Sequence, residues 1–193
     1  YYPREQILDC VGIGMDAMRS GSELQYQNMG RLQIGCHIKD QKERLEELAN
    51  FFKAIDMPYE VCEDIQHAMW NKFMINVGIN QTCMVYDTTY NVAVTPGPIM
   101  DDMIGAMKEV IRVAEAEGVA LTDQDLEQDV EILKGLNPEG YPSMRQDSIA
   151  KRPSEVDLFA GTVVALAEKH GIYVPINEKY LQMVKDIESE YNI

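Results

Sequence analysis

The sequence predicts a mainly α-helical protein, in which an all-helical domain follows a small α/β segment. Residues 1 to 62 hold short apolar stretches divided by glycines, an arrangement typical of strands joined by turns. From residue 63 to 193, apolar residues recur at helical spacing almost throughout. With 46% hydrophobic and 25% charged residues, the composition is that of an ordinary globular protein. We therefore expect two domains, over 1–62 and 63–193.

The first domain is expected to contain four strands and one helix. The strands are expected over 7–18, 24–26, 31–37 and 59–62, and the helix over 41–52. The segment from Gly12 to Ala17 reads GIGMDA and matches the G-x-G-x-x-A pattern of a pyrophosphate-binding turn. A helix must follow such a turn, yet a Ser-Gly-Ser run interrupts the chain soon after it, at Ser20 to Ser22. We therefore interpret Gly12 to Ala17 as a strand with a bulge rather than as a cofactor site.

The second domain is expected to consist of helices with recognisable ends. They are expected over 65–85, 99–117, 122–133, 154–170 and 178–191. Thr122 and Ser154 are each followed three residues later by an aspartate, the spacing of a capping box. Gly118 and Gly171 are expected to end the helices that precede them.

Charge and cysteine content narrow the class of partner and the compartment. The formal net charge is −15, from 32 acidic and 17 basic residues, which argues against nucleic acid and anionic membranes as partners. No apolar run approaches the ~20 residues that span a bilayer, and we expect no signal peptide, because a cationic stretch leading into an apolar core is missing at the start. The four cysteines are widely spaced, without a C-x-x-C pair and among apolar neighbours. We expect buried free thiols and a reducing cytosol.

A line of polar residues runs along the apolar helix expected over 65–85. Lys72, Asn76 and Asn80 are spaced i, i+4, i+8 and cover about 80° of the helix surface over about 12 Å. This line either forms a solvent-exposed face or grips a small polar molecule in a cleft. Exposing it would also expose Ile75 and Ile79, which project close to it, so the pattern favours the cleft.

Two further polar positions have ordinary explanations when taken alone. Ser143 begins a polar turn that leads into a helical stretch, where helix capping is the simplest interpretation. Glu155 is expected one residue inside the helix over 154–170, where the helix dipole favours a carboxylate.

Taken together, these segments resemble the ketopantoate reductase family. The resemblance is carried by W-x-K-x-x-x-N-x-x-x-N at Trp70 to Asn80, by S-M-x-Q-D at Ser143 to Asp147, and by a glutamate eight residues later. The ending H-G-I-x-V-P-x-N, from residue 170 to 177, fits the same family. The resemblance covers nearly the whole chain, and its motifs are specific as a set.

The resemblance implies a fold, a reaction and a role for each residue. Such enzymes reduce 2-dehydropantoate to pantoate, a step of pantothenate biosynthesis, with NADPH, in a cleft between a Rossmann domain and an all-helical domain. By resemblance, Lys72 is the catalytic lysine, Asn76, Asn80 and Ser143 bind the substrate, and Glu155 meets the nicotinamide ribose of NADP. A cytoplasmic enzyme with a small 2-oxo acid substrate, no metal ion and a possible homodimer is then expected.

One departure from the family pattern limits what the resemblance carries. The family's N-terminal G-x-G-x-x-G strand-turn-helix is absent, so residues 1 to 62 correspond to the last part of the NADP-binding domain. We expect the chain by itself to be inactive, with most cofactor contacts supplied from elsewhere. Two alternatives stay open: a 3-hydroxy acid dehydrogenase-type helical domain, and a non-catalytic helical interaction or dimerisation module.

Overall fold

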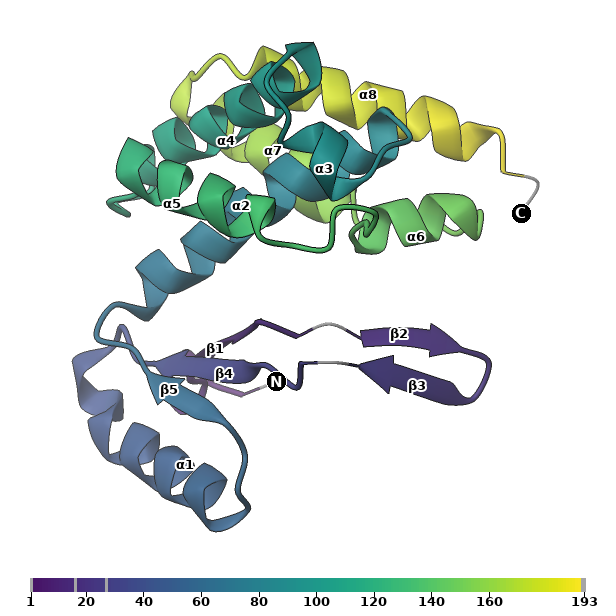
Figure 1. Cartoon of the computed structure of the whole chain (residues 1–193). Coiled ribbons are helices and arrows are strands. Elements are labelled where there is room, and N and C mark those ends of the chain that lie inside the picture. The colour runs from purple at the N-terminus through teal and green to yellow at the C-terminus, as the bar shows by residue number, and fades with distance from the viewer. Residues whose placement is uncertain (1, 16, 27, 192–193) are drawn as a thin grey trace. The chain divides into compact units, whose positions relative to one another are not determined.

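The computed structural model describes residues 2–15, 17–26 and 28–191, which divide into two compact units. One unit extends to Lys72 and the other begins at Phe73. The boundary falls inside a single helix, α2 (Ile65–Val85). The predicted fold class, mainly α with a small α/β segment at the start, is confirmed (Figure 1).

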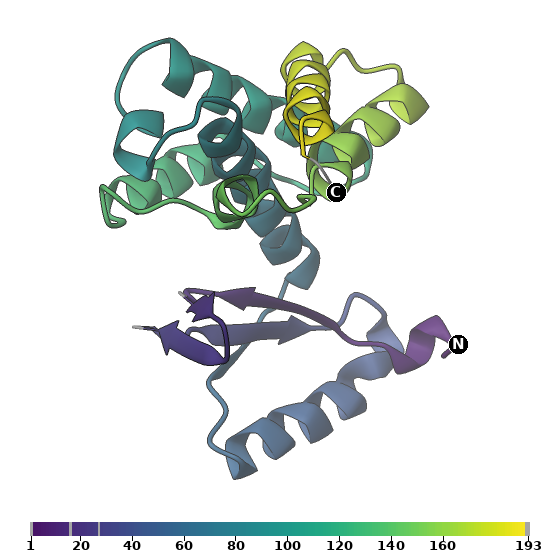
Figure 2. The same cartoon turned by 90° about the vertical axis from the view of Figure 1, so that its right-hand side faces the viewer.

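The first unit is built around a three-stranded sheet in the order β1-β4-β5. Its strands are β1 (Asp9–Ile13), β4 (Arg31–Gly35) and β5 (Tyr59–Val61). β1 runs antiparallel and β5 parallel to β4, with Ile34 paired to Cys10 on one side and to Val61 on the other. The crossover between the parallel strands passes through η2 (Lys39–Gln41) and α1 (Lys42–Ala54), and α1 lies against one face of the sheet (Figures 1 and 2).

A glycine lets α2 begin close to this sheet. A β-carbon on Gly35 would lie 2.5 Å from the β-carbon of Ile65, well inside van der Waals contact. The first residue of α2 therefore packs directly on the backbone at the end of β4, and Ile65 is 1% exposed.

The glycine-containing segment near the start forms strands and not a cofactor turn. β1 continues into a two-stranded hairpin of β2 (Ala17–Ser20) and β3 (Glu23–Tyr26), and the described residues between β1 and β4 contain no helix. The interpretation of Gly12 to Ala17 as strand is confirmed for Gly12, which pairs with Leu32. Asp16, in the same segment, lies outside the described residues.

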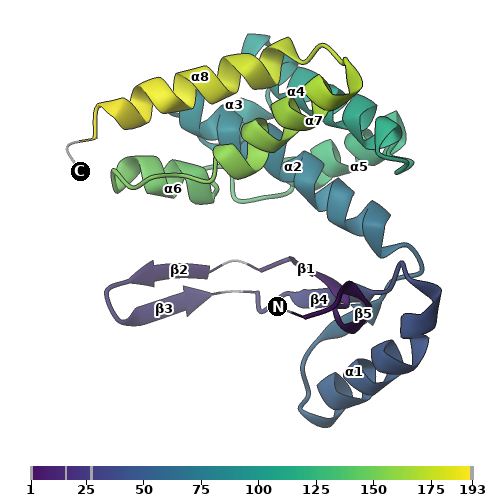
Figure 3. The same ribbon diagram turned by 180° about the vertical axis from the view of Figure 1, so that it is seen from behind.

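The second unit contains helices joined by loops, and its described residues form no strand. After α2 come α3 (Tyr90–Ala93), α4 (Pro98–Ala116), α5 (Asp123–Lys134), α6 (Ser143–Ile149), η3 (Asp157–Gly161), α7 (Thr162–His170) and α8 (Pro175–Ser189). α4, α7 and α8 pack on one another (Figure 3). Residues from all three are fully buried there, among them Met107, Val163 and Val184. This burial supplies the apolar core that fixes the helices.

The helix ends confirm one predicted capping box and correct the other. At α5, the Asp125 N–H donates to Thr122 Oγ1 at 3.2 Å, and the Thr122 N–H donates to Asp125 Oδ2 at 2.8 Å. The box predicted at Ser154 is wrong. The Ser154 N–H donates to Glu188 Oε1 at 2.7 Å instead, and the helix begins later, with a turn of π-helix at η3. Bonding to α8 therefore overrides the local capping signal.

The cysteines are free but not uniformly buried. Only Cys83 is buried; Cys36 and Cys62 are partly exposed, and Cys10 is exposed. The expectation of buried thiols fails in the first unit, where Cys10 lies in β1 and Cys36 and Cys62 directly follow β4 and β5 of a small sheet. Within the described ranges, no helix combines the length and apolar character needed to cross a membrane.

Candidate functional site

The polar line of α2 turns inward toward the protein interior. Lys72 and Asn76 are partly buried, while Asn80 is 5% and Ile79 is 3% exposed. The interpretation of the polar line as a solvent-exposed face is therefore wrong at Asn80. The remaining alternative, a cleft that accepts a small molecule, stays a prediction.

A chain of hydrogen bonds links three of the predicted site residues. Ser143 Oγ donates to Asn80 Oδ1 at 3.0 Å, although the two residues lie far apart in the sequence. The Met144 N–H donates to the same oxygen at 3.3 Å, and Asn80 Nδ2 donates to Asn76 Oδ1 at 3.3 Å. The interpretation of Ser143 as a simple helix cap is wrong, since its hydroxyl makes no capping bond in α6. The structure thus brings Asn76, Asn80 and Ser143 together.

These bonds determine which way the two amides point. A backbone N–H can only donate, so the Asn80 atom facing Met144 must be the carbonyl oxygen. The Asn80 NH₂ then faces Asn76 and donates to its oxygen. This leaves the Asn76 NH₂, which donates to no acceptor within the described residues, and one N–H of Asn80. The arrangement offers donors, and therefore suits a ligand rich in oxygen acceptors.

A second contact holds α6 to the end of α2. Arg145, two residues after Ser143, forms an ion pair with Asp87, just beyond α2. Asp87 has a φ of 51°, in the left-handed region that ends many helices. Cys83, near the end of α2, is buried, and burial raises its pKa to about 12 although the charge of Arg145 acts in the opposite direction. The thiol is therefore uncharged at neutral pH and is not a nucleophile here.

Glu155 lies apart from this hydrogen-bonded chain. It is exposed and precedes η3, so the prediction that it sits one residue inside a helix is wrong. The shift follows from the late start of the helix after Ser154. Its carbonyl accepts the N–H groups of Leu158 and Phe159, at 2.9 and 3.0 Å. Among the described residues, nothing engages its carboxylate, which is therefore available to a ligand.

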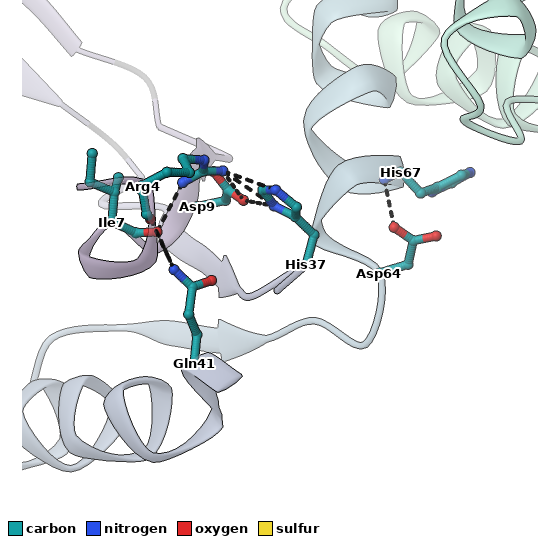
Figure 4. Close-up of polar contacts among 7 residues, drawn as sticks. All are labelled: Arg4, Ile7, Asp9, His37, Gln41, Asp64 and His67. Carbon is teal, nitrogen blue, oxygen red and sulfur yellow. Dashed lines mark hydrogen bonds and ion pairs between the residues drawn. The ribbon is translucent and has the colours of Figure 1, made fainter. Parts of the chain in front are cut away.

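The first unit carries a separate polar cluster at the carboxyl end of β4 (Figure 4). His37 Nδ1 lies 2.5 Å from Asp9 Oδ2, and Arg4 Nη2 donates to Asp9 Oδ1 at 2.7 Å. Gln41 Nε2 donates to the Ile7 carbonyl at 2.8 Å. These bonds tie η1 (Arg4–Gln6) to the sheet, although the buried Oε1 of Gln41 has no hydrogen-bond partner within the described residues. Nearby, Asp64 caps α2 by accepting the N–H of His67 at 2.9 Å.

The first unit also has an open pocket of about 460 Å³ between α1 and β5. Apolar and charged side chains line it, including Leu45, Val61, Lys42 and Glu63. None of the predicted site residues contributes to it. Within the described residues, no group of three or more histidine, cysteine or acidic side chains is arranged to hold a metal ion.

Sequence reasoning missed a buried hydrogen-bonded contact beside the polar line. Gln81, the neighbour of Asn80, is fully buried and accepts the Ala160 N–H of η3 at 3.1 Å. A glutamine inside an apolar helix is a signal in itself, because a buried amide needs hydrogen-bonding partners. Its partners lie far away in the sequence, so they could not be named from it.

Comparison with known proteins gives a consistent result. The family model described as ketopantoate reductase PanE/ApbA C terminal matches residues 64–188. The 2-dehydropantoate 2-reductase of Vibrio cholerae is 27% identical over 173 residues, which cover 89% of this chain and 57% of that protein.

Two solved structures share the fold. A dimeric ketopantoate reductase from Staphylococcus aureus has a TM-score of 0.80 at 20% identity, over 96% of this chain and 63% of that one. A D-mandelate dehydrogenase in complex with NADH has a TM-score of 0.83 at 19% identity, over 95% of this chain and 63% of that one. The chain therefore spans about three fifths of the length of the proteins it matches.

Proposed function

The chain belongs to the family of ketopantoate reductase C-terminal domains, and from this premise we propose that it carries the substrate-binding and catalytic residues of an NADPH-dependent 2-dehydropantoate reductase. The product would be pantoate, in pantothenate biosynthesis. Because the chain spans 57% of the Vibrio cholerae relative, activity is proposed for the full-length gene product and not for these residues alone.

The orientation of the two amides is the observation that carries the proposed substrate class. With its oxygen occupied by α6, Asn80 turns its NH₂ along α2, and Asn76 is left with donors to offer. A 2-oxo acid presents a carboxylate, a carbonyl and, in 2-dehydropantoate, a hydroxyl. Donors from Asn76 and Asn80, with the Ser143 oxygen as acceptor for a hydroxyl, match these groups.

Lys72 is assigned the chemical step. It lies one helical turn before Asn76, at a spacing that brings the two side chains to the same face of α2. Reduction of a keto carbon develops negative charge on its oxygen, and an ammonium within hydrogen-bond reach stabilises that charge and then donates a proton. The amides would orient the carbonyl toward the lysine, which lowers the entropic part of the barrier.

This chain offers only some of the contacts needed by the nicotinamide cofactor, which supplies the hydride when bound. The exposed carboxylate of Glu155 engages no described residue and could accept hydrogen bonds from the ribose hydroxyls. The described residues lack a glycine-rich turn between a strand and a helix, so contacts to the pyrophosphate are assigned to the rest of the protein. NADP rather than NAD follows from the family alone.

Compartment and assembly are also proposed by resemblance. The spacing of the cysteines supports a cytoplasmic enzyme. A homodimer is proposed because a relative with this fold is described as dimeric.

Cofactor oxidation by the purified full-length gene product tests the proposal. The assay compares 2-dehydropantoate with a bulkier aromatic 2-oxo acid, each with NADPH and with NADH. We expect the highest kcat/KM with 2-dehydropantoate and NADPH. Preference for the aromatic acid or for NADH would keep the reductase class but change the substrate or cofactor.

The two alternatives predict different outcomes of the same assay. Oxidation of a 3-hydroxy acid, without reduction of any 2-oxo acid, would indicate the dehydrogenase-type domain. No turnover with any of these compounds, together with stoichiometric capture of a protein partner, would indicate an interaction module.

A further inference from the structure

Gln81 is buried in α2 and uses both ends of its amide. Its side chain is 0% exposed. Nε2 donates to the Val77 carbonyl at 2.8 Å and lies 3.5 Å from Asn177 Oδ1. Oε1 accepts the Ala160 N–H at 3.1 Å. A buried primary amide is unfavourable without such partners, so its place in an apolar helix depends on these bonds.

Ala160 is the position at which η3 changes its hydrogen-bond spacing. The Phe159 N–H donates four residues back, to Glu155, at 3.0 Å, while the Gly161 N–H donates five residues back, to Val156, also at 3.0 Å. The Ala160 N–H falls between these two patterns and takes its acceptor from α2. N–H groups in the first turn of a helix lack internal partners. Gln81 therefore caps η3 from another helix.

The Gln81 amide is itself oriented from α8. Asn177 is fully buried, and its Nδ2 donates to Glu109 Oε2 at 2.8 Å and to the Ala106 carbonyl at 3.2 Å. Its oxygen therefore faces Gln81 Nε2. With the NH₂ group of Gln81 directed toward Asn177 and Val77, its oxygen is directed toward η3.

Two adjacent residues of α2 thus bind two different elements. Asn80 accepts bonds from the start of α6, and Gln81 accepts a bond from Ala160 of η3, which begins two residues after Glu155. We propose that Gln81 is a positioning residue that fixes Glu155, and so the nicotinamide ribose, in register with the oxo acid held at Asn80. This role rests on the proposed function, because it uses the substrate and cofactor assignments of Asn80 and Glu155.

Gln81→Met in the full-length gene product tests this role. Methionine has a similar length and packs well in a core, but it neither donates to Asn177 nor offers an oxygen to Ala160. We expect the KM for the nicotinamide cofactor to rise about tenfold or more, because a small misplacement of a binding group is costly. The KM for the oxo acid should change less than about twofold, since Asn80 is untouched. Hydrogen exchange at the Ala160 amide should become faster.

Two further variants separate positioning from general stability. Thr82→Val alters the next residue of α2, equally buried, and removes its 2.7 Å bond to Tyr180 without touching η3. It should lower stability but leave both KM values and Ala160 exchange unchanged. Gln81→Glu keeps an acceptor oxygen for the Ala160 N–H, but its second oxygen faces the Val77 carbonyl and Asn177 Oδ1 in place of a donor. It should therefore lower stability, yet restore part of the Ala160 protection and of the cofactor KM.

The outcomes are distinguishable. An unchanged cofactor KM in Gln81→Met, with faster Ala160 exchange, would make Gln81 a structural cap and overturn the proposal. So would an equal rise of the cofactor KM in Thr82→Val. A wild-type protein without reductase activity would overturn the proposed function and the role toward Glu155 together. Hydrogen exchange would still show whether Gln81 holds η3.

Discussion

At the scale of single residues, Lys72 and the amides should affect different kinetic constants. Lys72→Ala in the full-length gene product should lower kcat by on the order of 10²-fold or more, because the ammonium meets charge that appears only during reduction. Lys72→Arg should not rescue fully, since a guanidinium is bulkier and a poor proton donor at neutral pH. Steady-state kinetics decide between the roles. A near-normal kcat with only a raised KM would make Lys72 a substrate anchor.

Asn76 and Asn80 should differ in stability although both are assigned to the substrate. Asn80→Ala removes the acceptor of the Met144 N–H, so unfolding should cost about 1–3 kcal/mol less. Asn76→Ala removes only one hydrogen bond, to Asn80, and should lower the free energy of unfolding by less than about 1 kcal/mol. Urea unfolding of the two variants measures the difference, and both should raise the KM for the oxo acid. Equal losses of stability would contradict the hydrogen-bonded chain.

Residue types in the site could be predicted, but their partners could not. Helical spacing placed Lys72, Asn76 and Asn80 on one line, because α2 is regular over its whole length. Nothing local indicated that Ser143 would reach Asn80, or that Gln81 would reach Ala160. Those bonds depend on how distant helices pack.

At the scale of elements, a polar clamp joins the ends of three helices. Lys179 Nζ of α8 donates to Asp102 Oδ2 of α4 at 2.6 Å and to Tyr86 Oη, just after α2, at 3.0 Å. Tyr86 also donates to Asp102. Burial alone would raise the pKa of Asp102, but the bonds from Lys179 and Tyr86 outweigh it and hold that pKa below 3.8.

This clamp predicts part of the pH dependence of stability. A carboxyl whose pKa is lower in the folded state stabilises the fold above its unfolded pKa. That contribution is lost as the pH falls through the lower folded value. Wild type should therefore lose more stability than Asp102→Asn as the pH falls from about 5 to below 3.8, the unshifted value. Urea unfolding at each pH measures this, and parallel curves for the two proteins would exclude the clamp as its cause.

The size of the clamp's contribution can be measured separately. The side chains of Lys179 and Asp102 are 44% and 24% exposed, so solvent screens the pair. A double-mutant cycle of Lys179→Met and Asp102→Asn at neutral pH should give a coupling of about 0.2–1 kcal/mol. A coupling near zero would mean that Tyr86 alone sets the Asp102 pKa.

Helix existence was easier to predict than helix ends. The spans of α2 and α5 agree with the sequence because apolar periodicity and a local capping box both act within the segment. The start of the helix predicted over 154–170 does not agree with the structure, because Ser154 donates a hydrogen bond to Glu188 on α8. Local signals locate helix ends only where tertiary partners do not compete.

At the scale of the whole molecule, the sheet leaves an edge open within the described residues. β5 pairs with β4 on one side only, and its Val61 side chain is 49% exposed. Unpaired edges invite pairing with another chain. The 193-residue chain should therefore self-associate as its concentration rises, and Val61→Lys should reduce this.

Light scattering over a concentration series measures that association. Val92→Lys is a matched control, because Val92 is 42% exposed but lies in α3, away from the sheet. An equal effect of both variants would point to general surface hydrophobicity. A chain that stays monomeric at high concentration would contradict an accessible edge at β5.

The general architecture could be predicted because it follows from periodicity over long windows. Alternation and glycines indicated the sheet, and helical spacing indicated the rest. The compact units divide between Lys72 and Phe73, inside α2. The predicted domains over 1–62 and 63–193 remain a prediction. The assignment of residues 1–62 to an NADP-binding domain remains a prediction.

The π turn at η3 also acts as a phase shift in the chain. A π turn contains about one residue more than an α-helical turn. Residues before it are therefore rotated by about 100° around the helix axis, relative to where a regular α-helix would place them. Val156, Phe159 and Val163 are buried on the core side of this segment, while Glu155 remains at the surface. Deleting one residue from Asp157–Gly161 would restore regular helical winding and rotate Glu155 away from its direction. The number of residues in this turn is therefore constrained, even though the identities of its exposed side chains are not.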